Sequence, residues 1–391
     1  MVRRISPAGS NWGEWRWRSA ALLAAMLIVT ACGGTTPSAS PTAAPTAAAT
    51  TAPSGSADPG NACTEESVTA AEEALLEQAK TEPPLHYLTT LFPGTAEELH
   101  SAFSAKYGLE VSSTRITGAQ ALARLVGDNV AGNFTNSGAI GGVNPNMDPL
   151  VDSGDLLAIT ADNSAELFPR SCQIDQRFVG LRGLGIALYA YNASQFVVNT
   201  DLVPEDMYPE SWADFLDEFW AGKIVTQDPR VITPTLGIFH ALLQDYGPDY
   251  LTNWRNNVVG WHQSGATMME LVGSGENPAC WCNQATYGPY TAANPDAPVH
   301  LANMTGPVLY SSSDWVVNAK STSLASMRLL ISWGFSEEGQ EIINPAFGAP
   351  SLREDMTMPG VDPIPEDARL LDSEAAYAVR STILTLLGIP D

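Results

Sequence analysis

Nearly all residues at the turns between predicted strands and helices are hydroxyl, amide or glycine. These types hydrogen-bond small polar ligands, and a helix N-terminus adds free N–H groups and the positive end of its dipole. The chemistry suits an anionic or polar solute. The alternative is that any single residue merely caps its own helix. The turn residues are Thr89, Thr90, Thr117, Gly118, Asn136, Ser137, Thr233, Thr235, Ser264, Gly265, Ser311, Ser312 and Ser313.

The histidines form no catalytic pattern. His86, His100, His240, His262 and His300 are scattered, and none has a Cys, Asp or Glu at a spacing that chance would not supply. The chain also lacks a Gly-x-Ser-x-Gly elbow, a His-Glu-x-x-His motif, a phosphate-binding loop and a Gly-x-Gly-x-x-Gly after a strand. We therefore predict a protein that is no enzyme and has no cofactor.

The composition indicates a large, acidic, folded chain. Of 391 residues, 45% are hydrophobic and 16% are charged, which supplies a large core and too little charge for disorder. At roughly 150 residues per domain, this length predicts two to three domains. The 19 Lys and Arg against 43 Asp and Glu give a net charge of -24, which repels phosphate backbones. Nucleic-acid binding is therefore excluded.

Residues 1–31 are typical of a signal peptide. Arginines precede an apolar run from Ala20 to Ala31, about twelve residues where a membrane-spanning helix needs about twenty. The sequence Val29–Cys32 is similar to the bacterial lipoprotein cleavage motif, so we expect a lipidated Cys32 followed by a disordered tether over 32–61. The alternative is an ordinary signal peptide with a chance cysteine. The prediction is an exported protein, lipid-anchored on the extracytoplasmic face of the cell membrane.

Four further cysteines lie in the predicted folded part: Cys63, Cys172, Cys280 and Cys282. An exported compartment permits disulfides, and four cysteines allow three pairings. We favour Cys63 with Cys172, which would pin the N-terminal segment, and Cys280 with Cys282 as a tight loop. The alternative for Cys280 and Cys282 is a metal or redox site, although metal motifs usually have a wider spacing and two further ligands. We predict disulfides and no bound metal.

From Pro84 onward, short apolar runs alternate with amphipathic stretches. Leu85–Leu91 is typical of a strand, Thr95–Glu98 of a capping box, and Gly108 of a helix C-terminus. Leu109–Arg115 predicts a second strand, which is followed by another helix. This order predicts the α/β class, with a mostly parallel sheet and helices on both of its faces.

One segment carries a specific pattern: Pro209-Glu210-Ser211-Trp212-Ala213-Asp214-Phe215, then Trp220-Ala221-Gly222-Lys223-Ile224, then Asp228-Pro229. Ser211 and Asp214 predict the start of a helix over 212–218, and Gly222 its end. The pattern resembles a signature of bacterial extracellular solute-binding proteins, the receptors of ABC importers, nearest to the ferric-ion-binding branch. Residues 187–192 and 335–340 agree, and the likeness extends over about 84–353.

The resemblance implies a two-lobed periplasmic-binding-protein (type 2) fold with a ligand cleft between the lobes. Residues 62–185 with 300–350 would form lobe 1, and 186–299 with 351–391 would form lobe 2. The implied function is to capture a small polar solute and deliver it, as a monomer, to an ABC transporter membrane permease. The alternative is a non-transport surface lipoprotein. Open sheets bind ligands beyond the carboxyl ends of their strands, where the turn residues lie.

Ferric-ion binders of this family use an adjacent Tyr pair shortly after a Gly-Glu step in the second lobe. The step here is Gly275-Glu276, and the spacing places the pair on Ala285 and Thr286. Tyr287 and Tyr290 come later, so Fe(III) coordination would need a rearranged site. A ferric receptor with such a site is the alternative to an organic solute.

The loop Trp281–Tyr290 mixes aromatic rings with amide side chains, which favours an organic solute. Arg182 and Arg230 are candidates to pair with a carboxylate or phosphate, and surface arginines are the alternative. The predicted ligand-binding residues are Thr89, Thr90, Thr117, Asn136, Ser137, Thr235, Ser264, Asn283, Gln284, Tyr287 and Ser312.

Overall fold

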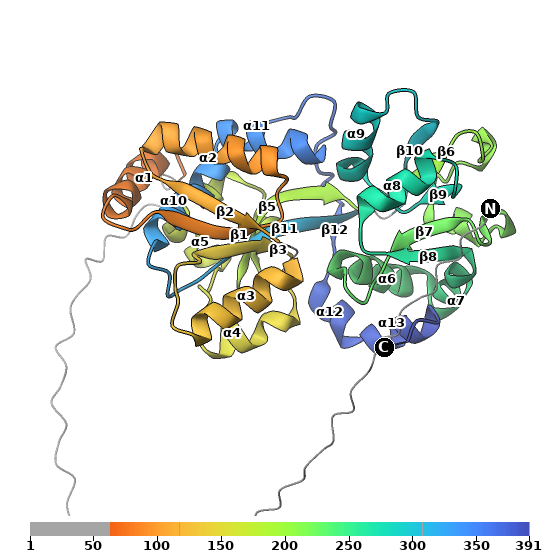
Figure 1. The fold of residues 1–391 in the computed structure, drawn as a ribbon, viewed down its shortest axis with the longest axis horizontal. Coiled ribbons are helices and arrows are strands. Elements are labelled where there is room, and N and C mark those ends of the chain that lie inside the picture. Colours follow the sequence, from red (N-terminus) through yellow and green to blue (C-terminus); the bar gives the residue numbers. More distant parts are fainter. Residues whose placement is uncertain (1–62, 117, 307, 391) are drawn as a thin grey trace, which may run out of the picture. The chain divides into compact units, whose positions relative to one another are not determined.

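The computed structural model describes residues 63–116, 118–306 and 308–390. The predicted signal peptide (1–31), the lipidated Cys32, the tether over 32–61 and the predicted site residue Thr117 all lie outside these described residues. Within them, no helix combines the length and apolar character needed to cross a bilayer. They form a mixed α/β structure on two sheets, each with its own helices (Figure 1).

The first sheet has seven strands in the order β2-β1-β3-β11-β5-β4, and β12 pairs with β11. β1 runs parallel to β2 and β3, whereas β11 runs antiparallel to β3 and β5. The sheet is therefore mixed rather than mostly parallel, because β11 is inserted in the opposite direction between β3 and β5. The strands are β1 (Leu85–Thr89), β2 (Val111–Arg115), β3 (Gly138–Gly141), β4 (Val179–Leu181), β5 (Gly185–Asn192), β11 (Leu309–Val317) and β12 (Arg369–Leu370).

Helices cover both faces of this sheet, as predicted. Neighbouring residues of a strand point to opposite faces, so Tyr87 packs in one core cluster with Phe103, and Leu88 packs in another with Leu125. In Figure 1, α2 and α11 lie above the sheet, and α3 and α4 lie below it. The helices are α1 (Glu65–Ala79), α2 (Pro93–Tyr107), α3 (Gly118–Val130), α4 (Asp148–Asp152), α5 (Ala161–Leu167), α10 (Leu324–Gly334) and α11 (Glu337–Ile343).

The second sheet has five strands in the order β10-β6-β9-β7-β8. Phe196 packs in a cluster with Trp212 and Trp254 on one face, while Val197 packs with Met268 on the other. The strands are β6 (Gln195–Asn199), β7 (Ile224–Gln227), β8 (Val258–His262), β9 (Ala279–Cys280) and β10 (Val299–Asn303). The helices are α6 (Thr233–Tyr246), α7 (Pro248–Asn257), α8 (Gly265–Gly273), α9 (Gln284–Ala293), α12 (Ser373–Ala378) and α13 (Arg380–Leu386).

Sheet membership differs from the predicted lobe ranges at three places. β5, placed in lobe 2 from residue 186, pairs with β11 and β4 in the first sheet. β10, placed in lobe 1 from residue 300, pairs with β6 in the second sheet. Within 351–391, Leu352 and Ala368 pack in the core of the first sheet, whereas Ile383 packs in that of the second. The first sheet therefore extends past residue 185 to the end of β5, and the second sheet extends past residue 299 to the end of β10.

The signature segment folds as 3-10 helices rather than as the α-helix predicted over 212–218. The capping box of Ser211 and Asp214 is present. The Asp217 backbone is extended, and its carboxylate accepts a hydrogen bond from the Phe219 N–H, which starts a new turn. The 3-10 helices are η1 (Pro145–Met147), η2 (Pro169–Gln173), η3 (Gln176–Phe178), η4 (Glu205–Met207), η5 (Trp212–Leu216), η6 (Glu218–Trp220) and η7 (Asn344–Phe347).

The ends of α2 were predicted with mixed success. The capping box at Thr95–Glu98 was wrong, because the helix already begins at Pro93 and Thr95 is buried in its first turn. Proline favours the first helical position, where its fixed φ suits the helix and its missing N–H costs nothing. The C-terminus at Gly108 is confirmed, with φ 69°, a conformation that glycine adopts without a steric penalty.

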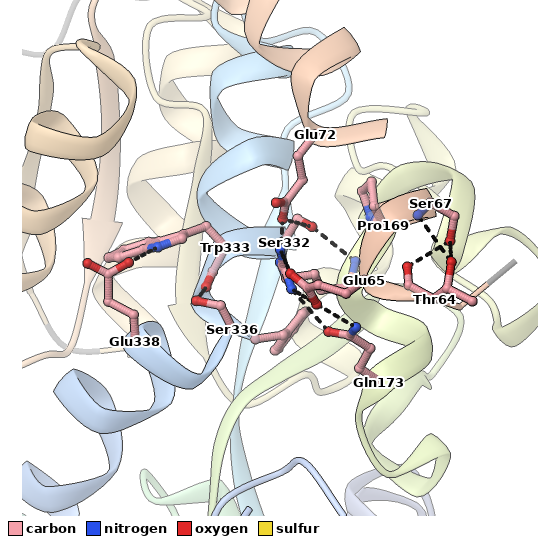
Figure 2. Close-up of polar contacts among 12 residues, drawn as sticks. Thr64, Glu65, Ser67, Glu72, Pro169, Gln173, Ser332, Trp333, Ser336 and Glu338 are labelled. Carbon is pink, nitrogen blue, oxygen red and sulfur yellow. Dashed lines mark hydrogen bonds and ion pairs between the residues drawn. The ribbon is translucent and has the colours of Figure 1, made fainter. Parts of the chain in front are cut away.

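Helix α1 is held to η2 and α10 by a covalent bond and a partly buried ionic network. Cys63 and Cys172 form a disulfide. Arg170 Nε donates to Glu72 Oε1 at 2.9 Å, and its Nη2 donates to Glu65 Oε1 at 2.6 Å. Figure 2 shows Glu72 also meeting Ser332, whose hydroxyl donates to Glu72 Oε1 at 2.7 Å. The network therefore joins α1, η2 and α10.

This network predicts an acid-sensitive contact at Glu65. Hydrogen bonds from Arg170 lower the pKa of Glu65 to about 2, from an ordinary value of 4.5. A carboxyl whose pKa falls on folding adds stability above its unfolded pKa, and that stability is lost as the pH falls through the folded value. We expect the protection factors of the α1 amides, which are their exchange rates corrected for the intrinsic pH dependence of exchange, to fall between about pH 4.5 and 2. This pH dependence should be absent in Glu65→Gln and retained in the control Glu66→Gln. The same pH dependence in Glu65→Gln as in the wild type would contradict the role of Glu65.

Candidate functional site

A cavity of about 260 Å³, called here the cleft cavity, opens between elements of the two sheets. Thr90 and Arg115 stand at the carboxyl ends of β1 and β2, and Gln227 stands at that of β7, as the rule for open α/β sheets predicts. The lining residues are Thr90, Phe92, Arg115, Tyr189, Tyr191, Ala193, Thr226, Gln227, Pro234, Thr235, Ile238, Gly265, Met268, Trp281, Cys282, Asn283, Ala285, Thr286 and Phe347.

Four helices begin at the cleft cavity: α2, α6, α8 and α9. The N-cap residues Phe92 and Ile232 make no side-chain capping hydrogen bond, so the first turns of α2 and α6 keep backbone N–H groups without side-chain caps. In α9 the N-cap Asn283 makes none either, but the Gln284 N–H donates to Gln195 Oε1 at 2.8 Å. Only Ser264, which accepts from the Thr267 N–H, caps its helix in this way. Uncapped N-termini attract negative charge through their N–H groups and dipoles.

Arg115 supplies positive charge at the same cavity. Its Nε donates to the Leu91 carbonyl at 2.9 Å, and its guanidinium carbon lies 5.7 Å from the centre of the Phe92 ring. It forms no ion pair with a described residue, and no lining residue among those described is Asp, Glu or His. The electrostatic character of the described cavity wall is therefore positive.

Aromatic rings form one wall of the cleft cavity. Tyr189 and Phe347 stack with ring centres 4.0 Å apart and planes 8° apart, and Phe92 stacks on Phe347 at 5.5 Å. Burial raises the pKa of Tyr191 to about 12 and raises that of Tyr189 as well. Both phenols are thus protonated at neutral pH and serve as hydrogen-bonding groups and flat surfaces rather than as anions.

Two hydroxyl groups at the cavity differ in how they are bonded. Thr235 Oγ1 donates to Gln227 Oε1 at 3.1 Å. Thr226 is fully buried on β7, and its Oγ1 has no hydrogen-bond partner within the described part of the chain. Buried hydroxyl groups are normally paired, so the unpaired Thr226 Oγ1 has hydrogen-bonding capacity left at the cavity wall.

Thr226→Val is expected to weaken solute binding about tenfold, because it removes a buried hydroxyl while keeping the side-chain shape. Its melting temperature should be unchanged or higher, since the hydroxyl has no protein partner. The measurement is calorimetric titration with the solute released from the purified protein. Thr252→Val, on α7 and away from the cavity, is the control. Equal affinity in both variants would remove Thr226 from the site.

Three predicted ligand-binding residues line the cleft cavity: Thr90, Thr235 and Asn283. The first follows β1, the second lies in the first turn of α6, and the third is the N-cap of α9. The reasoning from strand-to-helix turns thus brought together residues from both sheets. That a solute touches them stays a prediction.

The other described candidates do not line this cavity, and each has a local role. Thr89 Oγ1 accepts from the Leu91 N–H, and Ser264 caps α8. Tyr287 donates its hydroxyl to the Val299 carbonyl at 3.4 Å. Asn136 donates its amide to Asp128, Ser137 is fully buried, the Gln284 side chain lies against Gly348, and Ser312 borders a different cavity.

Sequence reasoning missed the residues that give the cavity its charge and its aromatic wall. Arg115 is the last residue of a predicted strand, a position that the turn argument did not weigh. Tyr189 and Tyr191 alternate along β5, but nothing in their spacing indicates that this side of the strand faces a ligand. Phe347 is far from both in the sequence, and only the fold stacks it on Tyr189.

Ala285 and Thr286, the positions at which the family's iron-binding Tyr pair falls, do line the cavity. Neither carries a phenolic oxygen, and Tyr287 and Tyr290 are not on the described wall. Over the described ranges, no three His, Cys, Asp or Glu residues are grouped so as to hold a metal ion. Cys280 and Cys282 form a disulfide, which leaves neither thiol as a metal ligand.

The comparison with family models identifies one family. The family model described as "Bacterial extracellular solute-binding protein" matches residues 145–379. No curated protein sequence matches the chain. Among solved structures, iron-bound HitA from Pseudomonas aeruginosa is similar, with a TM-score of 0.63 and 18% identity over 78% of this chain and 99% of that one.

Two other structures give the same result. AfuA, a periplasmic binding protein from Actinobacillus pleuropneumoniae with fructose-6-phosphate bound, has a TM-score of 0.60 and 20% identity over 77% of this chain and 96% of its own. The Trichodesmium protein IdiA (FutA), with iron and citrate, has a TM-score of 0.58 and 14% identity over 78% and 98%. At such identities these structures establish the two-lobed fold, and the family model spans most of the chain. The protein therefore belongs to the bacterial extracellular solute-binding proteins, the solute-binding components of ABC transporters.

Proposed function

We propose that this protein captures a small organic anion outside the cytoplasm and delivers it to an ABC transporter permease. The observation that carries the proposal is the charge of the cleft cavity. Uncapped N-termini of two helices, α2 and α6, and the Arg115 guanidinium meet there, and the described wall has no acidic side chain. An anion gains hydrogen bonds and favourable electrostatics at such a wall.

The same wall disfavours a ferric ion. Fe(III) needs anionic oxygen ligands, and the Tyr phenols that line the cavity have pKa values raised by burial. Of the neighbours, HitA and IdiA (FutA) are described with iron and AfuA with a sugar phosphate. The hydrogen-bond donors of this cavity suit a ligand of the sugar-phosphate kind, which has a polar body and an anionic group. The aromatic wall at Tyr189 and Phe347 would cover the apolar face of that body.

Native mass spectrometry of the purified protein, before and after mild denaturation, tests the proposal. We expect a bound species that is released on unfolding, has the mass of a small organic molecule and ionises as an anion. Arg115→Glu should carry none of it, and Lys80→Glu, which changes the charge of an exposed residue on α1, should carry as much as the wild type. Released iron, or a neutral or cationic solute, would contradict the proposed ligand class.

We further infer that the protein is a monomeric lipoprotein anchored at the extracytoplasmic membrane surface through Cys32. An apolar run of about twelve residues is too short to span the membrane, so retention would depend on lipid. Cys32→Ala is expected to appear in the soluble fraction or to remain unprocessed, whereas the wild type should fractionate with membranes. Membrane retention of a Cys32→Ala protein cleaved at another site would contradict the lipid anchor.

A further inference from the structure

A second cavity, of about 250 Å³, shares only Pro234 with the cleft cavity. Its walls come from β11, from the loop after β3, from the turn at Leu181–Gly183, from the first turn of α6 and from the segment after β12. At ~30 Å³ per water molecule it has room for about eight waters. A molecule of amino-acid size therefore fits this space.

Asp314 gives the second cavity a buried negative charge. The residue is 2% exposed, and its Oδ2 accepts from the Val143 N–H at 3.0 Å. Its Oδ1 accepts from the Ser312 hydroxyl at 2.5 Å. Burial raises the pKa of Asp314 to about 6, so the carboxyl is mostly ionised at neutral pH. Among the residues that the structure describes, no cation pairs with it, and a buried carboxylate without a counter-charge is complementary to a cationic ligand.

Arg182 gives the same cavity a donor without an acceptor. Its Nη2 pairs with Asp148 Oδ1 at 3.2 Å and its Nε with Glu374 Oε2 at 3.3 Å. Its Nη1 is buried and has no partner in the described ranges. The backbone φ of Arg182 is 51°, a left-handed conformation that is unfavourable for arginine. Strained residues of this kind cluster at functional sites.

The rest of the wall is mixed: it holds a second carboxylate, that of the exposed Asp372, which adds to the negative charge of Asp314, and an apolar part. Val143, Leu181, Tyr310 and Leu370 contribute to it, and Val143 and Tyr310 are 6% and 4% exposed. A ligand that satisfies Asp314 and Arg182 would therefore have to carry an aliphatic or aromatic body between its two charged ends.

We propose that the second cavity binds a small amphipathic zwitterion, with a primary ammonium for Asp314, a carboxylate for Arg182 and a short aliphatic body. The ammonium would meet the Asp314 carboxylate, which pairs with no cation among the described residues, and the carboxylate would meet Arg182 Nη1, the guanidinium nitrogen left without an acceptor beside the pairs with Asp148 and Glu374. The site lies apart from the cleft cavity and does not rest on the function proposed there.

Three probes with the same branched aliphatic body test the charge requirement by calorimetric titration of the purified protein. L-leucine carries both charged groups, isopentylamine carries only the ammonium, and 4-methylpentanoate carries only the carboxylate. We expect L-leucine to bind at one site and at least tenfold more tightly than either single-charge probe. Absence of L-leucine binding, or equal binding of isopentylamine, would overturn the proposal.

Two variants locate the probes within the cavity. Asp314→Asn, which keeps the side-chain shape, should lower L-leucine affinity at least tenfold. Arg182→Met should bring the affinities for L-leucine and isopentylamine within about twofold of each other, because neither probe then finds the guanidinium. This ratio is informative even if Asp314→Asn folds poorly. Arg230→Met, an arginine paired with Asp228 and off the cavity, is the control and should bind as the wild type does.

The cleft cavity provides the remaining control. L-leucine binding should survive in Arg115→Glu, which alters only the cleft. Loss of L-leucine binding in that variant would place the probe in the cleft cavity and overturn the second site. Unchanged L-leucine binding in both Asp314→Asn and Arg182→Met would also overturn the second site.

Discussion

Replacing Arg170 by methionine is expected to lower the free energy of unfolding by about 3–5 kcal/mol. The side chains of Arg170 and Glu72 are 7% and 5% exposed, so their ion pair is shielded from water. Methionine fills much of the arginine volume but leaves the Glu72 carboxylate buried with Ser332 as its polar partner. A buried charge that has lost its counter-charge is destabilising out of proportion to the bond removed. Urea unfolding followed by circular dichroism measures the change.

Two further variants separate charge from packing. Arg124→Met removes an arginine of α3 whose side chain is 61% exposed in its pair with Asp128, and it should cost about 1 kcal/mol or less. The double variant Arg170→Met with Glu72→Leu should regain most of the lost stability, because an apolar pair can replace a buried ion pair at little cost. A double variant as unstable as Arg170→Met would show that lost packing, not the unpaired carboxylate, causes the effect.

Arg115→Glu is expected to weaken binding of the cleft solute about a thousandfold. Loss of a hydrogen bond to a charged group costs about 1.5–3 kcal/mol, and the new carboxylate repels an anion by a similar amount. Their sum of about 4 kcal/mol corresponds to roughly a thousandfold in affinity. Arg115 is exposed, so the melting temperature should change little. The affinity is measured by titration with the solute identified by mass spectrometry.

Arg115→Lys is the matched variant, since it keeps the charge but loses the planar guanidinium. It should lie between the wild type and Arg115→Glu. The weakening should also be larger at low salt than at high salt, because the exposed charge is screened. Equal affinity in Arg115→Glu and the wild type would remove the anion from the neighbourhood of Arg115 and, with it, the proposed ligand class.

Local signals in the sequence predicted the fold class well. Gly108 ends α2 as expected, and the alternation of strands and helices does produce sheets covered on both faces. The direction of β11 was not predictable in this way, because an apolar strand has the same pattern in either direction. Helix α1 was missed, although Thr64 caps it and Glu65 and Glu66 lie in its first turn.

The sequence predicted a cavity-lining residue only where its position in a single local segment was enough to place it at the cavity. Thr90 and Thr235 follow from the rule that strand-to-helix turns meet at the cleft, whereas Asn283 follows from the composition of the loop Trp281–Tyr290. The aromatic wall could not be predicted from the sequence, because Tyr189 and Phe347 lie far apart in the chain and stack only in the folded protein. Gln284 and Tyr287 have suitable chemistry, but the helix of α9 turns them toward protein groups instead of the cavity.

The Cys63–Cys172 disulfide also determines where mechanical load enters the folded part of the molecule. Cys63 stands immediately before α1, and Cys172 lies in η2, which packs against α10. A pull on the backbone before Cys63 therefore passes in part through the sulfur bridge into η2, and the chain between the two cysteines, which stand 109 positions apart in the sequence, carries only the rest. The force is divided before it reaches the first turn of α1. Tension applied to the chain before Cys63 is therefore less able to unwind α1 from its first turn.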